Sequence, residues 1–278
     1  MNHHLTETRF KDFDLDPSII KGLDEAGFEF CTPIQEQSIP IALTGKDIAG
    51  EAQTGTGKTA AFMVACLDHL LKTPAHEQRQ KADIRTMILA PTRELAIQIH
   101  KDACVIGKYT GLSFGLAYGG TDYDKQRRIL EDGIDILIGT PGRTIDFFKQ
   151  RVFSLKKCEV VILDEADRMF DLGFIDDMRY LLRRCPDPDK RLSLLFSATL
   201  SHRVGELAYV HMNDPAEIRV EAETKTADKI EQSIYYPANE EKIPLLLGLM
   251  EKLKPTRSIV FINTKRVADK VYAWLEGN

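Results

Sequence analysis

The sequence has few cysteines and lacks a long apolar run. Its five cysteines are scattered and odd in number, and no two of them have CxxC spacing, which argues against a disulfide framework and a zinc site. The longest aliphatic run, residues 245–250, is far too short to cross a bilayer. The N-terminal residues lack the apolar core of a signal peptide. These absences predict a cytoplasmic protein with no membrane segment.

An excess of positive charge is also missing. The chain has 37 Lys and Arg against 42 Asp and Glu, a net charge of -5. The molecule as a whole is therefore not a basic coat for nucleic acid, and any nucleic-acid surface must be a local patch. With 278 residues and 43% hydrophobic side chains, it can bury the core of one large domain or of one and a half ordinary ones.

Short apolar runs recur along the chain, separated by stretches with helical periodicity. These runs are residues 47–52, 86–91, 112–118, 134–140, 160–167 and 192–199. Runs that are apolar without alternation are typical of strands buried on both faces, as in a parallel sheet covered by helices. The repeated strand–helix pattern predicts a doubly wound α/β domain.

The pattern changes at residues 213–228, which are polar, acidic and weakly periodic, so we predict a domain edge and linker there. A second α/β pattern follows, with predicted strands at 231–237 and 257–264 and predicted helices at 240–253 and 266–277. Two strands and two helices cannot close a doubly wound sheet. We therefore expect an incomplete second α/β domain.

The stretch AQTGTGKT lies between a predicted strand and a predicted helix, the setting that a phosphate-binding loop requires. Gly55 and Gly57 let the backbone N–H groups turn toward one point, and the helix N-terminus adds partial positive charge. Lys58 can reach the β- and γ-phosphates, and the Thr59 hydroxyl can hold Mg²⁺. The strict motif begins with Gly, whereas this loop begins with Ala52. The predicted nucleotide-binding residues of the loop are Ala52, Gln53, Thr54, Gly55, Thr56, Gly57, Lys58 and Thr59.

Two carboxylates follow the apolar run VVIL. Asp164 and Glu165 emerge at its carboxyl end, the end that carries the ligand crevice in open α/β sheets. Asp164 would coordinate Mg²⁺, which keeps much of its water. Glu165 would orient and deprotonate an attacking water. Acidic residues at a strand end can also be solvated caps, but a GKT loop earlier in the same pattern favours the catalytic interpretation.

Eight segments in order resemble the DEAD-box RNA helicases, and the resemblance covers nearly the whole chain. Each segment alone is weak, whereas eight in the right order are specific, and this family commonly begins its loop with the alanine seen here. Within the family, several segments are similar to a bacterial branch that partners RNA-degrading enzymes. The eight segments are GFEFCTPIQ (27–35), AQTGTGKT (52–59), PTRELA (91–96), GG (119–120), TPGR (140–143), DEAD (164–167), SAT (197–199) and IVFINT (259–264).

The resemblance implies an organisation into RecA-like P-loop NTPase domains with ATP and Mg²⁺ as cofactors. It predicts an N-terminal extension with the glutamine motif at 1–36 and a first helicase domain at 37–222. A linker at 223–229 and the start of a second helicase domain at 230–278 follow. The chain ends at Asn278, before the family's arginine-finger motif, so we expect slow ATP hydrolysis and no unwinding from this chain alone. A truncated RNA- or protein-binding module is the alternative.

The family also implies how the base is bound. Gln35 would recognise adenine, since a side-chain amide can pair with the N6/N7 edge of that base. Phe10 lies where the family places an aromatic that stacks on adenine, and Phe13 competes with it but is better suited to the core. Outside the TPIQ context, Gln35 would be an ordinary surface amide.

The remaining roles rest on the resemblance. Ser197 and Thr199, counted with Lys58, Asp164 and Glu165 among the catalytic residues, would bond to Asp167 and couple nucleotide state to RNA binding.

Backbone contacts to RNA, with little base readout, would come from glycine N–H groups and arginine forks on phosphate, and a preference for RNA would rest on 2′-hydroxyls. Arg93 and Arg143 begin predicted helices and could instead pair with nearby carboxylates. The predicted RNA-binding residues are Thr92, Arg93, Gly119, Gly120, Thr140 and Arg143.

Overall fold

The structure, a computed structural model, describes residues 5–120, 122–220, 231 and 233–277. The chain divides into two compact units, Met1–Glu223 and Thr224–Asn278, and each is described by itself. The predicted linker at 223–229 lies outside the described residues.

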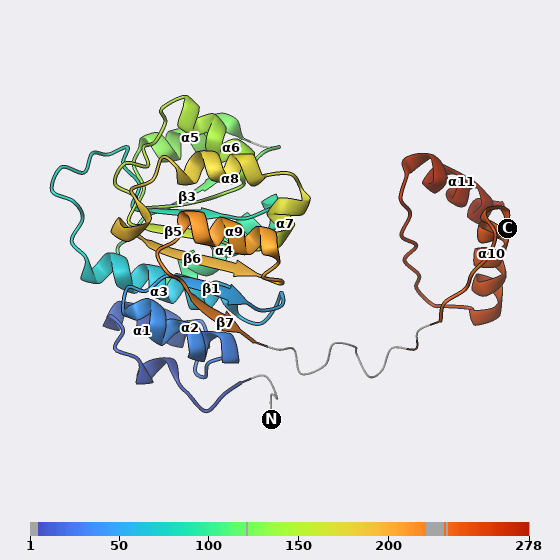
Figure 1. Cartoon of the computed structure of the whole chain (residues 1–278), viewed down its shortest axis with the longest axis horizontal. Coiled ribbons are helices and arrows are strands. Elements are labelled where there is room, and N and C mark those ends of the chain that lie inside the picture. The colour runs from blue at the N-terminus through green and yellow to red at the C-terminus, as the bar shows by residue number, and fades with distance from the viewer. Residues whose placement is uncertain (1–4, 121, 221–230, 232, 278) are drawn as a thin grey trace. The chain divides into compact units, whose positions relative to one another are not determined.

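The larger unit is built on a seven-stranded sheet (Figure 1). The strands run in the order β3-β4-β2-β5-β6-β1-β7 and every neighbouring pair is parallel. Six of them fall in the six predicted apolar runs, which confirms the doubly wound α/β fold. The strands are β1 (Ile48–Glu51), β2 (Thr86–Leu89), β3 (Phe114–Ala117), β4 (Ile136–Gly139), β5 (Val160–Leu163), β6 (Leu192–Ser197) and β7 (Ala216–Arg219).

Helices cover both faces of the sheet. Figure 1 shows α1, α2 and α3 on one side and α5, α6 and α8 on the other. Single turns of 3-10 helix occur at Phe10–Asp12 and Pro188–Lys190. The helices of this unit are α1 (Pro17–Glu25), α2 (Pro33–Leu43), α3 (Lys58–Lys72), α4 (Arg93–Ile106), α5 (Tyr123–Glu131), α6 (Pro141–Lys149), α7 (Ala166–Asp171), α8 (Ile175–Leu182) and α9 (His202–His211).

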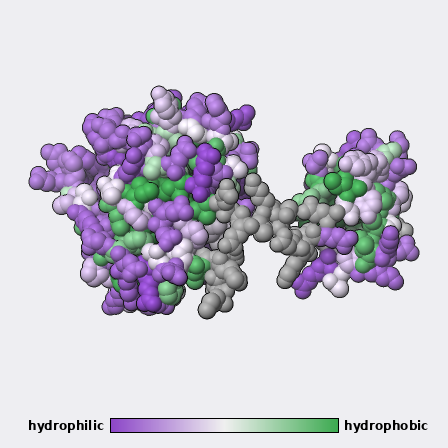
Figure 2. All heavy atoms as spheres, turned by 60° about the horizontal axis from the view of Figure 1, so that its bottom comes forward, coloured by the Kyte–Doolittle hydropathy of each residue, from purple (hydrophilic) through white to green (hydrophobic). Residues whose placement is uncertain are grey.

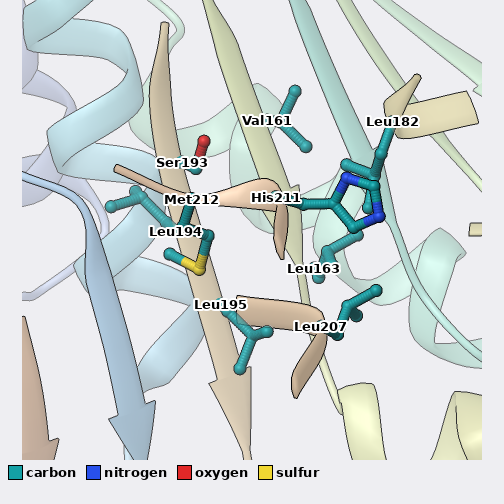
Figure 3. A pocket seen from close by; sticks show the side chains of 9 residues that line it. All are labelled: Val161, Leu163, Leu182, Ser193, Leu194, Leu195, Leu207, His211 and Met212. Atoms are coloured by element: carbon teal, nitrogen blue, oxygen red, sulfur yellow. The ribbon is translucent and has the colours of Figure 1, made fainter. Parts of the chain in front are cut away.

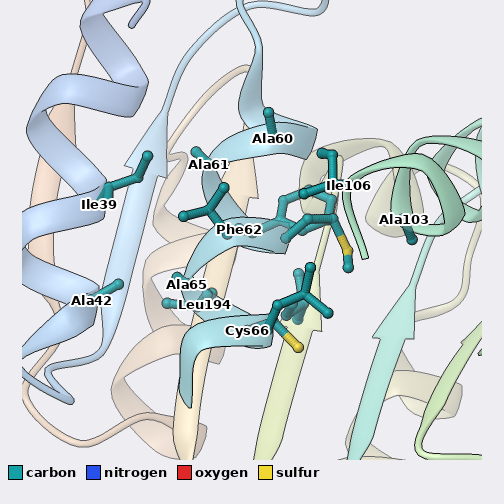
Figure 4. Packing of buried hydrophobic residues seen from close by; sticks show 14 of the residues in the cluster. Ile39, Ala42, Ala60, Ala61, Phe62, Ala65, Cys66, Ala103, Ile106 and Leu194 are labelled. Atoms are coloured by element: carbon teal, nitrogen blue, oxygen red, sulfur yellow. The ribbon is translucent and has the colours of Figure 1, made fainter. Parts of the chain in front are cut away.

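Alternation along the strands creates two cores. In β5, Val160 and Ile162 pack with the side chains of α1 to α4, while Val161 and Leu163 pack with those of α5 to α9. Figure 4 shows Phe62 of α3 in the first core, which residues of α2 and α4 also line. Because α3 is buried along most of its length, the loop that precedes it is anchored to the centre of the domain.

A small apolar space lies in the second core between β6 and α9 (Figure 3). Its volume is about 10 Å³, roughly the room for one water molecule. His211 lines it, and burial, reinforced by the charge of Arg191, lowers the pKa of this imidazole to about 4. The neutral ring is part of the packing, and the space is too small for a ligand larger than a water molecule.

Strand β7 corrects the sequence analysis, which placed residues 213–228 in a domain edge and linker. Ala216–Arg219 pairs in parallel with β1. The buried carboxylate of Asp47 holds this edge, because it accepts hydrogen bonds from the Asn213 N–H at 2.8 Å and the Ser193 N–H at 2.7 Å. Only Ile218 of the strand is buried, so its apolar content was too low to reveal a strand.

The smaller unit contains α10 (Lys242–Leu253) and α11 (Lys265–Glu276), close to the predicted helices, and a 3-10 turn at Asn239–Glu241. The strands predicted at 231–237 and 257–264 are wrong for the described residues of both segments. An extended segment becomes a strand only when a neighbour pairs with its N–H and C=O groups, and no described residue does so here.

Apolar side chains of the smaller unit are left on its surface, as Figure 2 shows in green. Ile259 is 82% exposed and Phe261 is 92% exposed. In the described part of the chain, no helix is both long and apolar enough to cross a bilayer.

Candidate nucleotide and RNA site

The predicted motifs follow the carboxyl ends of the strands, which meet at one edge because the sheet is parallel. The strand order separates them into two neighbouring groups. The loops after β1, β5 and β6 carry the predicted nucleotide residues, and the loops after β2, β3 and β4 carry the predicted RNA residues. The predicted nucleotide residues of these loops and the predicted RNA residues thus occupy neighbouring halves of the same sheet edge.

Two glycines give the loop between β1 and α3 its shape. Gly55 has φ 86° and Gly57 has φ 89°, a left-handed conformation in which a Cβ is strained. A Cβ on Gly57 would also lie 2.4 Å from Nε2 of Gln35, whereas one on Gly55 would meet nothing within 4 Å. The backbone at Gly55 therefore faces open space, where a phosphate could approach.

Lys58 begins α3 and is only 6% exposed. Its ammonium donates to the Ala52 carbonyl at 2.8 Å, which closes the loop on itself. A buried ammonium held by one neutral carbonyl has donors left for a stronger, anionic acceptor. This geometry suits a phosphate-binding lysine.

A cleft of about 340 Å³ opens beside the loop. Lys58, Thr59, Asp164 and Glu165 all line it, so residues about a hundred positions apart share one site. Its remaining lining residues are Phe28, Thr54, Gly55, Gly57, Ala60, Leu95, Gln98, Asp102 and Ile106.

Asp164 is 2% exposed, and its Oδ1 accepts a hydrogen bond from the Glu165 N–H at 2.9 Å. Burial raises the pKa of this carboxyl to about 6; the Lys58 charge lowers it and the Glu165 charge adds to the rise. A divalent cation would stabilise the ionised form, and carboxylate and hydroxyl oxygens are the ligands that Mg²⁺ prefers. The described residues contain no group of three or more His, Cys, Asp or Glu that could hold a metal, so Mg²⁺ here would keep water or phosphate ligands.

We expect Mg²⁺-dependent nucleotide binding to weaken as the pH falls through about 6, the pKa of Asp164, because the protonated carboxyl is a poor ligand. Without Mg²⁺, the folding stability of the chain changes with pH in the opposite direction to nucleotide binding. The folded pKa lies above the ordinary value of 3.8, so protonation favours folding and Asp164 makes the chain less stable as the pH rises from 3.8 to about 6. Titration with a fluorescent ATP analogue, with and without Mg²⁺, measures the effect. An Asp164→Asn variant with the same pH dependence would contradict it.

Glu165 is tied to the phosphate loop. Its Oε1 accepts from the Thr54 hydroxyl at 3.0 Å and its Oε2 from Nη1 of Arg168 at 3.2 Å. The residue has φ 51°, a conformation that costs a non-glycine residue free energy and is often found at functional sites. The carboxylate is thereby aimed at the cleft.

The last aspartate of the DEAD segment contacts the SAT segment. The Asp167 N–H donates to the Ser197 hydroxyl at 3.1 Å. The N–H and hydroxyl of Thr199 donate to Oδ2 of Asp167 at 3.1 and 3.3 Å. These bonds join the ends of β5 and β6, so a shift of one segment would move the other.

Phe10 is not placed for the predicted stacking on adenine. It is 1% exposed within the first core, and Phe13 also packs against that core. The aromatic at the cleft is Phe28, which is 36% exposed and touches the Phe10 ring edge-on at 6.1 Å. Sequence reasoning missed Phe28, although it follows Gly27 in the GFEF segment.

The Gln35 amide is already bonded at both ends. Its Nε2 donates to the Gly57 carbonyl at 2.9 Å, and its Oε1 accepts from the Thr32 N–H at 2.8 Å. The side chain is 2% exposed. It links α2 to the phosphate loop and does not line the cleft, but the amide keeps a second N–H and a second oxygen lone pair for a base.

The predicted RNA residues cluster in two places. Beyond β2 and β3, the Arg93 guanidinium lies over the Tyr118 ring at 5.2 Å, and a Cβ on Gly120 would be 3.3 Å from Nη1 of Arg93. Thr92 caps α4 by accepting from the Leu95 N–H at 3.3 Å. A Cβ on the neighbouring Gly119 would meet nothing within 4 Å.

Beyond β4, Thr140 is the residue before α6 and Arg143 lies in its first turn. The Arg143 guanidinium stacks on the Tyr123 ring at 4.7 Å, and its Nη1 is buried without a hydrogen-bond partner among the described residues. Its nearest carboxylate oxygen, on Asp146, is 4.0 Å away. The alternative pairing of Arg143 with a carboxylate is therefore weak, and Arg93 forms no ion pair within the described residues.

Comparison with known proteins agrees with this geometry. The family described as "DEAD/DEAH box helicase" matches residues 32–207. Proteins named ATP-dependent RNA helicase RhlB are 56% identical over 272 residues in Vibrio vulnificus and 57% identical over 273 residues in Xanthomonas oryzae; each match covers 98% of this chain, but only 62% and 48% of the relatives. The one from Psychromonas ingrahamii is 57% identical over 275 residues, 99% of this chain and 66% of its own length. The chain thus spans about half to two thirds of these relatives, and it belongs to the DEAD/DEAH box helicase family.

Proposed function

We propose that this chain is the ATP-binding motor part of an ATP-dependent RNA helicase, with RNA-stimulated ATP hydrolysis coupled to local unwinding. The observation that carries the proposal is the shared cleft of Lys58, Thr59, Asp164 and Glu165. The names of the relatives, ATP-dependent RNA helicase, support the same activity. Residues 37–222 would form the first RecA-like domain and residues 230–278 the start of a second.

The chain's own residues would divide the work of phosphoryl transfer. Lys58 would exchange the Ala52 carbonyl for phosphate oxygens, and loop N–H groups would hold the phosphates. Glu165 would orient the attacking water and take its proton. Thr59 and Asp164 would hold Mg²⁺, which supplies positive charge to the phosphate oxygens when bound.

RNA would lie along the other half of the sheet edge. Within the described part of the chain, Arg143 has a buried Nη1 without a partner, and Arg93 lies over the Tyr118 ring with no carboxylate paired to it. Both guanidiniums would fork onto phosphates, with Thr92, Thr140 and the Gly119–Gly120 backbone beside them. None of these groups reads a base in the expected arrangement, so we expect little sequence specificity.

The contact of Asp167 with Ser197 and Thr199 would couple the nucleotide half of the sheet edge to the RNA half. It lies between the loop that carries Asp164 and the end of the neighbouring strand. We extend the proposal to a cytoplasmic role in RNA degradation beside RNA-degrading enzymes. This wider role rests on the resemblance of the sequence to one bacterial branch of the family.

We expect purified residues 1–278 to bind ATP weakly and hydrolyse it slowly, with little stimulation by RNA. An arginine finger is worth roughly 10³–10⁵ in rate in related NTPases, and the family carries it in a complete second domain. The test measures ATP turnover with and without single-stranded RNA. It compares this chain with the extended protein, defined as this chain continued into a complete second helicase domain from a relative.

Stimulation confined to the extended protein would support the helicase proposal. Robust RNA-stimulated turnover by the unextended chain would contradict its expected low activity. Absence of stimulation in both proteins would favour the alternative, a module that binds RNA or protein without a catalytic cycle.

A further inference from the structure

A second, larger groove lies at the opposite edge of the sheet from the nucleotide cleft. Its walls come from the segments that precede β2 and β5, from the end of α6 and from α8. In a parallel sheet the amino ends of the strands meet at one edge and the carboxyl ends at the other. The groove has a volume of about 1100 Å³ and shares no lining residue with the cleft. It is therefore a separate surface, away from the predicted RNA residues.

The groove is strongly basic although the chain is acidic overall. Its cations are Lys149, Arg151, Lys156, Lys157 and Arg184. In the part of the chain that the structure describes, every ion pair uses a cation other than these five.

The single acid that lines the groove cannot balance these charges. Asp83 is 8% exposed, and its Oδ2 already accepts from the Gln80 N–H at 2.9 Å. Uncompensated charges in a concave, partly apolar surface focus the local potential. The groove therefore attracts a negatively charged ligand.

The aromatic residues of the groove do not form an open platform for bases. The face of Tyr180 is covered by the Arg184 guanidinium at 3.8 Å, and the Lys149 ammonium lies 5.5 Å from the same ring. Phe148 meets Tyr180 edge-on at 6.2 Å, and Phe153 is only 3% exposed. Single-stranded nucleic acid is gripped through accessible aromatic faces, so the chemistry favours carboxylates over RNA.

We propose that this groove docks an acidic peptide segment of a partner protein. Its Asp or Glu side chains would pair with Lys149, Lys156 and Arg151, and with the donors of Arg184 that its bond to the Tyr180 carbonyl at 3.3 Å leaves unused. An apolar residue of the segment would lie against the half-buried Phe148. Several such pairs act together, whereas one exposed pair contributes little, and the interaction weakens with salt.

The test uses residues 1–278 and a short fluorescein-labelled peptide of Glu and Asp with a central Leu, followed by fluorescence anisotropy at low salt. The same peptide with Gln and Asn in place of the acids is the first control. The Lys149→Glu/Lys156→Glu variant should bind the acidic peptide at least about tenfold more weakly, since two attractions become repulsions. Hydrogen exchange of the unsubstituted chain should show protection of residues 148–157 on peptide binding.

A Lys101→Glu/Lys252→Glu variant changes the net charge equally at exposed positions outside the groove, and it should bind like the unsubstituted chain. An equal loss in both variants would mean general charge attraction and would overturn the proposal. So would equal binding of the neutral peptide. If the groove variant instead loses affinity for a single-stranded RNA and not for the peptide, the groove is an RNA surface and the proposal is wrong.

Discussion

Replacing Glu165 by Gln is expected to lower ATP turnover by the extended protein at least about a hundredfold, the lower range of general acid–base catalysis. Glutamine keeps the size of the side chain and can still accept the hydrogen bond that the Thr54 hydroxyl now gives to Oε1 of Glu165 at 3.0 Å. It cannot take a proton from water at neutral pH. Nucleotide affinity should stay within about threefold, a difference of less than 1 kcal/mol. Steady-state turnover and titration with a fluorescent ATP analogue measure the two quantities separately.

The matched control is Glu131→Gln, the same change at an exposed residue of α5 that pairs with Arg127. It should leave both turnover and binding unchanged. If Glu165→Gln abolishes nucleotide binding together with turnover, the carboxylate holds the loop in shape through Thr54 and Arg168 and the catalytic role is wrong.

Replacing Arg85 by Met is expected to lower the free energy of unfolding of the larger unit by about 3–5 kcal/mol, the usual cost of removing one partner of a buried ion pair. Arg85 is 5% exposed, and its guanidinium donates to both carboxylate oxygens of Glu159 at 2.6 and 2.7 Å. It also donates to the carbonyls of Leu70 and Thr73 at 3.0 and 2.7 Å. The substitution would leave Glu159 without its partner and the end of α3 without donors.

Urea unfolding followed by circular dichroism measures this loss. Fluorescence is unsuitable, because the single tryptophan is Trp274 in the smaller unit. Arg127→Met, which breaks an exposed pair with Glu131, should cost less than about 1 kcal/mol. If both variants lose the same free energy of unfolding, the buried Arg85–Glu159 pair stabilises the fold no more than an exposed pair does, and the prediction is wrong.

The fold could be predicted where buried elements have a recognisable apolar pattern in the sequence. Central strands such as β5 are covered on both faces, so they read as continuous apolar runs. Edge strand β7 is covered on one side and buries only Ile218, which is why it resembled a linker. The segments at 231–237 and 257–264 have strand-like composition, but strand formation depends on a partner that composition does not reveal.

The candidate site was predictable as a set of residues more than as a set of contacts. The spacing of the motifs placed Lys58 and Asp164 at strand ends, and parallel pairing brings those ends together. It favoured Phe10 over Phe13 and did not point to Phe28, because tertiary packing decides which of these rings is buried and which lines the cleft. The basic groove could not be predicted from the sequence for a related reason. Its cations come from residues 149–157 and from the distant Arg184, and only the fold brings them together with the half-buried aromatic side chains.

The doubly bonded amide of Gln35 has a consequence for how a base could be chosen. Any purine that engages this amide meets one N–H and one carbonyl lone pair that are still open, because the Gly57 carbonyl and the Thr32 N–H use only one of each. Those two bonds fix the plane of the amide and set which end donates and which accepts. A base with the matching edge can make both remaining bonds, whereas a wrong base would leave a buried donor or acceptor stranded, at a cost of about 1–3 kcal/mol. Discrimination at this position would then arise largely from a penalty on misfits, imposed by an amide whose orientation is set before the base arrives.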